Sequence, residues 1–126
     1  MINVDRRKSE RTNLAAHAKL LAVKENEVYV CDTLDVSPGG LGIVTLRTFS
    51  QDTTCMVSFD IDCRGRRIRI NANGIVVATS SHAARSYRTG IRFLDMDSRS
   101  QYLLDCFVRH RCNGSHCNAG LADIDL

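Results

Sequence analysis

Three arginines near the start of the chain have the side-chain chemistry to hold phosphate or a guanine base. Arg6, Arg7 and Arg11 all lie in or at the end of the segment RRKSER, ahead of the first apolar stretch. The planar guanidinium group donates two parallel hydrogen bonds to a phosphate or to the edge of guanine, and it can stack on a base. The alternative is that these arginines are only part of a charged terminus in solvent. On composition alone, that is the commoner role of such a segment.

A second group of polar residues lies in the segment DVSPGGLG. Asp35 and Ser37 are two residues apart at the end of a predicted strand, so we expect both side chains on one face. A carboxylate there can accept hydrogen bonds from guanine N–H groups, and the hydroxyl can serve phosphate or base. Pro38 and Gly39 suit the centre of a type II turn, and Gly40 would let a ligand approach the backbone. A plain turn, with Asp35 bonded to its own backbone, is the open alternative.

Hydrophobic periodicity indicates the elements that must position these residues. Six segments show the alternation or the short apolar runs of β-strands. They span residues 14–23, 24–37, 40–46, 53–62, 67–80 and 87–96. Gly74 lies inside the fifth segment, where a glycine is typical of a bulge or bend.

The period changes to that of a helix after residue 96. Ser98, with Gln101 three residues later, fits a helix-capping pattern. The apolar residues that follow at helical spacing are Leu103, Leu104, Phe107 and Val108. The sequence therefore predicts a mainly β fold, a six-stranded antiparallel β-barrel with one C-terminal α-helix over its end or side.

Composition limits the class of protein. The chain has 126 residues, 44% of them hydrophobic and 25% charged, which suits one globular domain. A net charge of +3 is too small to imply general binding of polyanions. No apolar run is long enough to span a bilayer or to act as a secretory signal, so we expect a cytoplasmic protein without membrane insertion. We expect reduced thiols, with Cys31 and Cys55 buried as small apolar residues.

Other clusters point less clearly to function. Arg67 and Arg69 share one face of a predicted strand, which is typical of a solvated outer face; a second basic rim is the alternative. His110 and Cys106 precede a tail containing Cys112, His116 and Cys117, but the spacings fit a structural zinc site only loosely, so we expect no metal.

Nothing in the sequence assembles a catalytic set. His17 and His82 are expected on a strand and in a loop, with no acid at useful spacing. We therefore expect no catalytic residue and no enzyme activity.

The arginine arm and the glycine-rich turn together resemble the PilZ family of cyclic di-GMP receptors. An Arg-x-x-x-Arg arm formed by Arg7 and Arg11 precedes the first strand. An Asp-x-Ser-x-x-Gly motif formed by Asp35, Ser37 and Gly40 ends the second. The segment TGIRFLDMDSRSQYLLDCFV is similar to that family's last strand and closing helix. The resemblance covers nearly all of the chain before the tail.

The resemblance implies a binding module. In the family the arginines of the arm hold guanines and phosphates, and the Asp-x-Ser-x-x-Gly turn surrounds the other side of the ligand. Carried over, the ligand-binding residues are Arg6, Arg7, Arg11, Asp35, Ser37 and Gly40. Arg6 holds the position that, in family members, accompanies binding of two intercalated ligand molecules, so a dimeric ligand is a secondary expectation. No cofactor besides this ligand is implied.

The expected organisation is a flexible arginine arm at residues 1–12, a PilZ-like barrel with its closing helix at 13–112, and a mobile tail at 113–126. Ligand binding would order the arm, and the protein would then signal to an effector protein. We expect a monomer that binds neither DNA nor RNA.

Two other functions are weighed against this one. PilZ-like modules that assemble with type IV pilus machinery do not bind the nucleotide, but they usually lack both the arm and the Asp-x-Ser turn. A small barrel that binds single-stranded nucleic acid needs aromatic stacking platforms. This chain has no tryptophan, three tyrosines and four phenylalanines, most of them at core-like positions, so that reading ranks last.

Overall fold

The structure, a computed structural model, describes residues 11–113 as a closed β-structure with one helix. Its elements are β1 (Thr12–Asn13), β2 (His17–Ala22), β3 (Glu27–Ser37), β4 (Gly40–Thr45), β5 (Thr54–Cys63), β6 (Arg66–Ala83), β7 (Ser86–Asp95) and α2 (Ser98–Asn113). The six predicted strands all form, within a few residues of the expected bounds. β1 is an addition, because two residues are too few to show a period.

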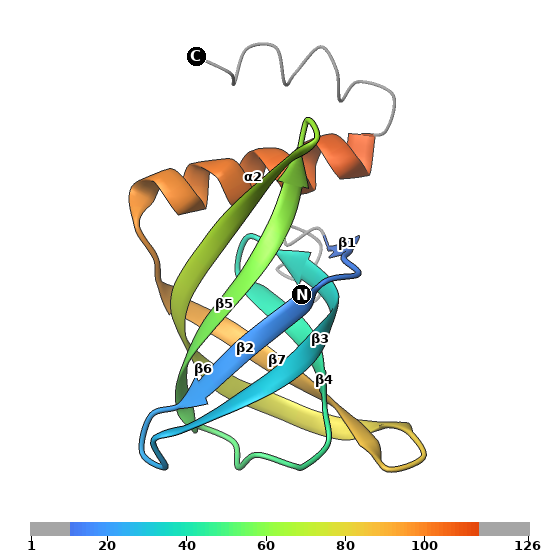
Figure 1. Ribbon diagram of the computed structural model, residues 1–126, viewed down its shortest axis with the longest axis vertical. Helices are drawn as coiled ribbons and strands as arrows, with labels where there is room; N and C mark the ends of the chain where they lie inside the picture. Colours follow the sequence, from blue (N-terminus) through green and yellow to red (C-terminus); the bar gives the residue numbers. More distant parts are fainter. Residues whose placement is uncertain (1–10, 114–126) are drawn as a thin grey trace, which may run out of the picture.

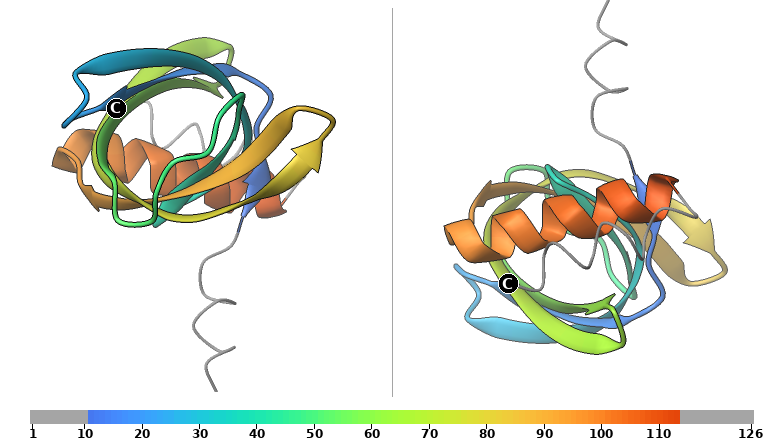
Figure 2. Two further views of the ribbon diagram at one scale, coloured as in Figure 1. Left: turned by 90° about the horizontal axis from the view of Figure 1, so that it is seen from below. Right: turned by 90° about the horizontal axis from the view of Figure 1, so that it is seen from above.

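The strands close into a ring. Along the sheet the order is β1-β3-β2-β5-β6-β7-β4, all neighbours are antiparallel, and β4 pairs back onto β3. The ring therefore has six strands, with β1 paired onto the end of β3 (Figure 1). Helix α2 lies across one end of the ring, while the opposite end is open to view (Figure 2). The predicted antiparallel barrel with one C-terminal helix is confirmed.

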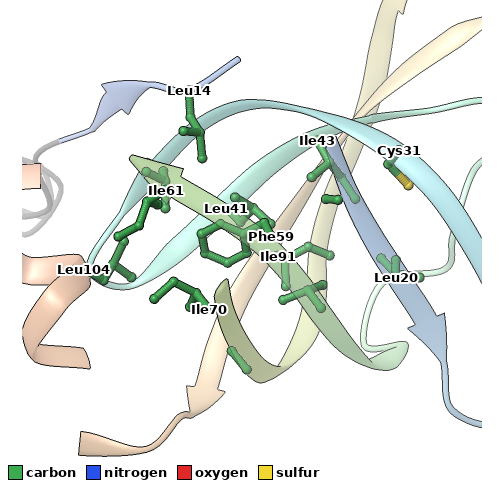
Figure 3. Packing of buried hydrophobic residues seen from close by; sticks show 14 of the residues in the cluster. Leu14, Leu20, Cys31, Leu41, Ile43, Phe59, Ile61, Ile70, Ile91 and Leu104 are labelled. Atoms are coloured by element: carbon green, nitrogen blue, oxygen red, sulfur yellow. The ribbon is translucent and has the colours of Figure 1, made fainter. Parts of the chain in front are cut away.

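The core fills the inside of this ring. Alternate residues of each strand point inward, so that Phe59, Ile43 and Ile91 from three different strands meet there (Figure 3). From α2, Leu104 and Phe107 are buried in the same cluster and close its end. Burying the apolar stripe of α2 against the end of the ring stabilises both elements, because it removes apolar surface of each from water.

The register between β6 and β7 shifts beside Gly74, as predicted, but the extra residue there is Leu94 on β7. The bulge within β6 itself lies at Val77, between the paired residues Val76 and Ala78. A bulge raises the local twist of a strand and helps a long strand bend around a barrel.

The cap of α2 differs from the prediction. Asp97, and not Ser98, caps the helix: its carboxylate accepts from the backbone N–H of Ser100 at 2.7 Å and from the Ser100 hydroxyl at 3.1 Å. Ser98 is already the first helical residue. Asp97 lies three residues before Ser100, the spacing at which a side-chain oxygen reaches a free N–H of the first turn.

The β3–β4 turn also differs from the prediction. Gly39 does not have a positive φ, so the turn is not type II. The carbonyl of Gly39 accepts from the N–H of Phe93 on β7 at 2.9 Å, and its own N–H donates to the Ser37 hydroxyl at 3.3 Å. These two contacts connect the turn to β7 and to the Ser37 side chain.

The described cysteines are as expected. Cys31 and Cys55 are buried free thiols, and Cys63 and Cys106 are buried as well. Burial raises the pKa of Cys31 and of Cys55 to about 11, so both stay protonated at neutral pH. In the part of the chain that the structure describes, no helix has the length and apolarity needed to cross a membrane.

The cap of α2 can be tested by substitution. Asp97→Ala should lower the urea midpoint of unfolding at pH 7, and Ser98→Ala should lower it less, because only Asp97 binds free N–H groups of the first turn. Hydrogen bonds from Ser100, the backbone N–H foremost, lower the pKa of Asp97 below its ordinary value of 3.8. The cap's contribution is therefore present above pH 3.8 and is lost as the pH falls through the lowered pKa.

The measurement compares the urea midpoints of both variants and the wild type at pH 7 and at pH 3. A larger effect of Ser98→Ala, or an effect of Asp97→Ala that grows in acid, would contradict this assignment of the cap.

Gly40 is required by packing against β7. A Cβ atom at Gly40 would lie 2.5 Å from the carbonyl oxygen of Ile91, which is backbone and cannot swing away. Gly40→Ala should therefore destabilise the fold by about 1–3 kcal/mol. At Gly39 a Cβ atom would meet nothing within 4 Å, so Gly39→Ala should stay within about 0.5 kcal/mol of wild type. Chemical denaturation of both variants checks the difference, and equal stabilities would refute it.

Candidate ligand-binding site

A bulge in β3 decides which way the predicted site residues point. The register between β3 and β4 shifts between Thr33 and Asp35, leaving Leu34 as the extra residue. Before the bulge Thr33 is inward and buried, and after it Val36 is inward with no exposed surface. The bulge thus changes which residues face the core, and it turns Asp35 and Ser37 away from it.

Asp35 lies between two arginines. Arg11 donates from Nη2 to Oδ1 of Asp35 at 2.7 Å, and Arg88 donates from Nη2 to Oδ2 at 3.0 Å. The Asp35 side chain is only 19% exposed, so these contacts replace much of its hydration. Arg11 comes from the start of the described chain and Arg88 from β7, so one carboxylate joins segments that are distant in sequence.

Gly42 makes room for this arrangement. A Cβ atom there would lie 2.6 Å from Oδ1 of Asp35 and 2.8 Å from Nη2 of Arg88. Gly42 is the register partner of Asp35 on β4, directly between β3 and β7. The glycines of the turn therefore have different tasks: Gly40 admits the backbone of β7, and Gly42 admits the ion pair.

Strand β1 brings the end of the arm to the site. Thr12 pairs with Val36, and Asn13 pairs with Asp35, so Arg11 is placed next to Ser37. The segment that follows is fastened to β3, because the hydroxyl of the buried Thr33 donates to the Leu14 carbonyl at 2.6 Å. The structure thus joins Arg11 to the Asp-x-Ser turn, whereas Arg6 and Arg7 lie outside the described residues.

A pocket of about 540 Å³ opens beside this ion pair. Its lining includes the predicted residues Arg11, Ser37 and Gly40, and it adds Arg88 and Arg92 from β7. Three guanidinium groups therefore surround one pocket. This is the electrostatic arrangement expected where an anionic ligand binds.

Two of the predicted residues are more enclosed than expected. Ser37 is only 2% exposed and its hydroxyl already accepts from the N–H of Gly39, so it supports the turn. Gly40 touches the backbone of Ile91, so packing alone already explains its lack of a side chain. Their part in ligand binding stays a prediction, as does that of Asp35 and the three arginines.

Arg88 and Arg92 were not among the predicted site residues. Both lie in a strand whose alternation was recognised, but nothing local marks either one as part of a site. Arg88 reaches Asp35 only because β4 pairs with β7 on one side and with β3 on the other. The pairing of strands that are far apart in sequence was the missing information.

The remaining clusters do not form a second site of the same kind. Arg69 pairs with Asp60, and Arg67 is the register partner of Asp62, which suits a solvated outer face. Cys112, His116 and Cys117 carry no described side chains. Among the side chains that are described, no group of three or more metal-binding residues occurs.

The predictions for His17 and His82 were wrong in one respect each. His82 lies on β6 and not in a loop. His17 does have an acid beside it, since its Nδ1 lies 2.9 Å from Oδ1 of Asp32 on the paired strand. The side chains of His17 and Asp32 are both largely exposed. The pairing of their strands brings them together, and spacing along the sequence does not reveal that pairing.

Comparison with known proteins supports the fold. The structure is similar to that of the Bacillus subtilis inhibitor of motility (MotI/DgrA), with a TM-score of 0.75 and 13% identity over 87% of this chain and 52% of that one. The PilZ domain of Escherichia coli YcgR with c-di-GMP gives a TM-score of 0.63 at 14% identity, over 90% and 97% of the two chains. YcgR in complex with c-di-GMP gives 0.65 at 16% identity, over 95% of this chain and 50% of that one.

The protein spans about half the length of MotI/DgrA and of that YcgR chain. Identities this low establish a common fold and no more. No curated protein matches the chain by sequence. The sequence profile of the PilZ domain, however, matches residues 5–110, which is most of the chain. The protein therefore belongs to the PilZ domain family.

Proposed function

We propose that this protein is a receptor for cyclic di-GMP, and that it is a binding module without enzyme activity. The observation that carries the proposal is the Asp35 carboxylate held between Arg11 and Arg88 at the edge of a pocket with three guanidinium groups. A cyclic dinucleotide has two phosphates and two guanines. The pocket lining offers cations to the phosphates, and the Asp35 carboxylate, which is bound to two of those cations, is available beside the pocket for a guanine N–H edge.

In the free protein, Arg11 and Arg88 neutralise Asp35 and keep its carboxylate in place. When the ligand arrives, its phosphates compete for the guanidinium groups, and guanine N–H groups compete for the carboxylate. The ligand thus exchanges one set of charge-assisted hydrogen bonds for another. The resting ion pairs keep the site assembled before the ligand arrives, which reduces the cost of organising it.

The remaining arm residues complete the site. We propose that Arg7 and Arg6 fold over the ligand from the side opposite the Asp-x-Ser turn, with Arg6 stacking against a second, intercalated molecule. Coupled ordering of a segment costs about 2–5 kcal/mol of the interaction energy. An affinity in the micromolar range, about −8 kcal/mol, is therefore expected.

The ordered arm would present a new surface to an effector protein in the cytoplasm. The solved YcgR structures contain c-di-GMP, and MotI/DgrA is described as an inhibitor of motility. These descriptions support a signalling role for the present chain, which we propose acts as a monomer. They do not identify its effector.

Replacing Arg7 tests the proposal. Arg7→Ala should leave the melting temperature unchanged and weaken binding of cyclic di-GMP at least tenfold. The substitution removes a guanidinium group that we propose contacts the ligand, and it removes no side chain from the core. Isothermal titration calorimetry measures the affinity, with linear di-GMP and GTP as specificity controls. Arg67→Ala, a matched change on the β5–β6 hairpin outside the pocket, should bind like the wild type.

Stoichiometry separates the two ligand forms. If two molecules bind per chain, Arg6→Ala should reduce the ratio to one. If Arg7→Ala binds the ligand with unchanged affinity, Arg7 is not part of the binding site. No binding by folded wild-type protein would favour the alternative, a protein-interaction module of type IV pilus machinery.

A further inference from the structure

The outer face of the barrel carries an apolar patch away from the nucleotide pocket. We define the β3 patch as Val28, Val30, Leu46, Leu21 and Met56. In it, Val30 is 73% exposed, Leu46 is 82% exposed and Val28 is 58% exposed. Large apolar side chains this exposed are common singly, but a contiguous group indicates an interaction surface.

Strand register shows that the patch is contiguous. Val28 lies opposite Leu21 on β2, and Leu21 lies opposite Met56 on β5, so three apolar side chains form one row. Val30 follows two residues after Val28 on the same face. Asp32 is paired with Val44, and Leu46 follows Val44 by two residues, just after β4 ends at Thr45. The contact of the next residue, Arg47, with Tyr29 places Leu46 near the Val28–Val30 part of β3.

The loop that carries Leu46 is anchored. The guanidinium group of the next residue, Arg47, lies 4.4 Å from the ring centre of Phe49 and donates to the Tyr29 hydroxyl at 2.9 Å. It also pairs with Glu25 at 3.2 Å. Leu46 is therefore held in an exposed position by its neighbours, and a partner would meet a preformed surface with little ordering cost.

Lys19 indicates what the partner must carry. It lies opposite Val30 on β2 and opposite Ser58 on β5, within the patch. Its ammonium group has no ion-pair partner among the residues that the structure describes. Three pairs of charged groups around the patch neutralise each other: His17 with Asp32, Arg69 with Asp60, and Arg47 with Glu25. Lys24 and Glu27 lie at its edge, where β2 turns into β3, so Lys19 is the unpaired charge within the patch.

We propose that the β3 patch docks a protein partner that presents aliphatic or aromatic side chains around one carboxylate, which pairs with Lys19. A second copy of this chain fits less well, because a two-fold axis at the patch centre would oppose Lys19 to itself. An anionic membrane also fits less well, since the carboxylates of Asp32, Asp60 and Glu25 lie around Lys19 and would repel an anionic surface.

This docking surface is separate from the nucleotide site. Val30 and Ser37 lie seven residues apart along β3, or roughly 20 Å at the rise of an extended strand. A partner on the patch would thus leave the pocket open. The proposal stands whether or not the pocket binds cyclic di-GMP. One small barrel would then carry the β3 patch, which binds its partner at all times, and a second surface that forms only when the ligand is bound.

Peptide selection tests the chemistry of the patch. A displayed library of random 12-residue peptides is selected against the wild type, Leu46→Asp and Lys19→Glu. Wild type should enrich peptides with one Asp or Glu flanked by aliphatic or aromatic residues, and these should bind Leu46→Asp at least tenfold more weakly. Lys19→Glu should select Lys or Arg at the same place. Leu94→Asp, a matched change at an exposed leucine outside the patch, should bind like the wild type.

Melting curves by circular dichroism confirm that each variant is folded, independently of any nucleotide. Amide NMR spectra of the wild type with a selected peptide should show shifts at Lys19, Val28 and Val30. Peptides without a carboxylate, equal binding to Leu46→Asp, or failure to enrich any peptide would overturn the proposal. So would a dimer in sedimentation experiments that Leu46→Asp dissociates, or binding of wild type to anionic vesicles through the patch.

Discussion

The site depends on one half-buried carboxylate that two arginines from opposite parts of the chain must reach. Asp35 meets that requirement because a bulge at Leu34 turns it outward, and because Gly42 leaves its Oδ1 and the Arg88 guanidinium unobstructed. Strand β1 brings Arg11 to the other side. Removing any one of these features would deprive the partly desolvated carboxylate of a charged partner, and such a loss costs more than the ion pair itself contributes. The ring closure between β3, β4 and β7 is thus also what assembles the site.

Local features of the chain were predictable, and features set by strand pairing were not. The six strands and the helix follow from the period of apolar residues, and the burial of Cys31 follows from its apolar surroundings. The helix cap was misassigned by one residue, because Asp97 and Ser98 are both good caps and only the geometry at Ser100 separates them. The type II turn was wrong, because Gly39 does not adopt the positive φ that such a turn needs. Arg88 was missed because its contact with Asp35 depends on the pairing of strands that are distant in sequence.

Strand β3 connects two surfaces with different chemistry. Its C-terminal end supplies Ser37 to a pocket rich in guanidinium groups and Asp35 to the ion pair beside that pocket. Its start supplies Val28 and Val30 to an exposed apolar face that contains Lys19. The bulge at Leu34 lies between them and allows each end to present different side chains outward. A rigid barrel of this kind can bind a partner protein at one surface and a small ligand at another without a large change in its own fold.

The most direct test of the account is an amide NMR titration of the wild-type protein with cyclic di-GMP. We expect selective shifts at Arg11, Gly42 and Arg88, which lie around the Asp35 carboxylate, and at Ser37 and Gly40, which line the adjacent pocket. Little change is expected at Val28 and Val30. Shifts confined to other parts of the barrel, or unchanged spectra of a folded sample at millimolar ligand, would contradict the claim that this ion-paired carboxylate marks a nucleotide site.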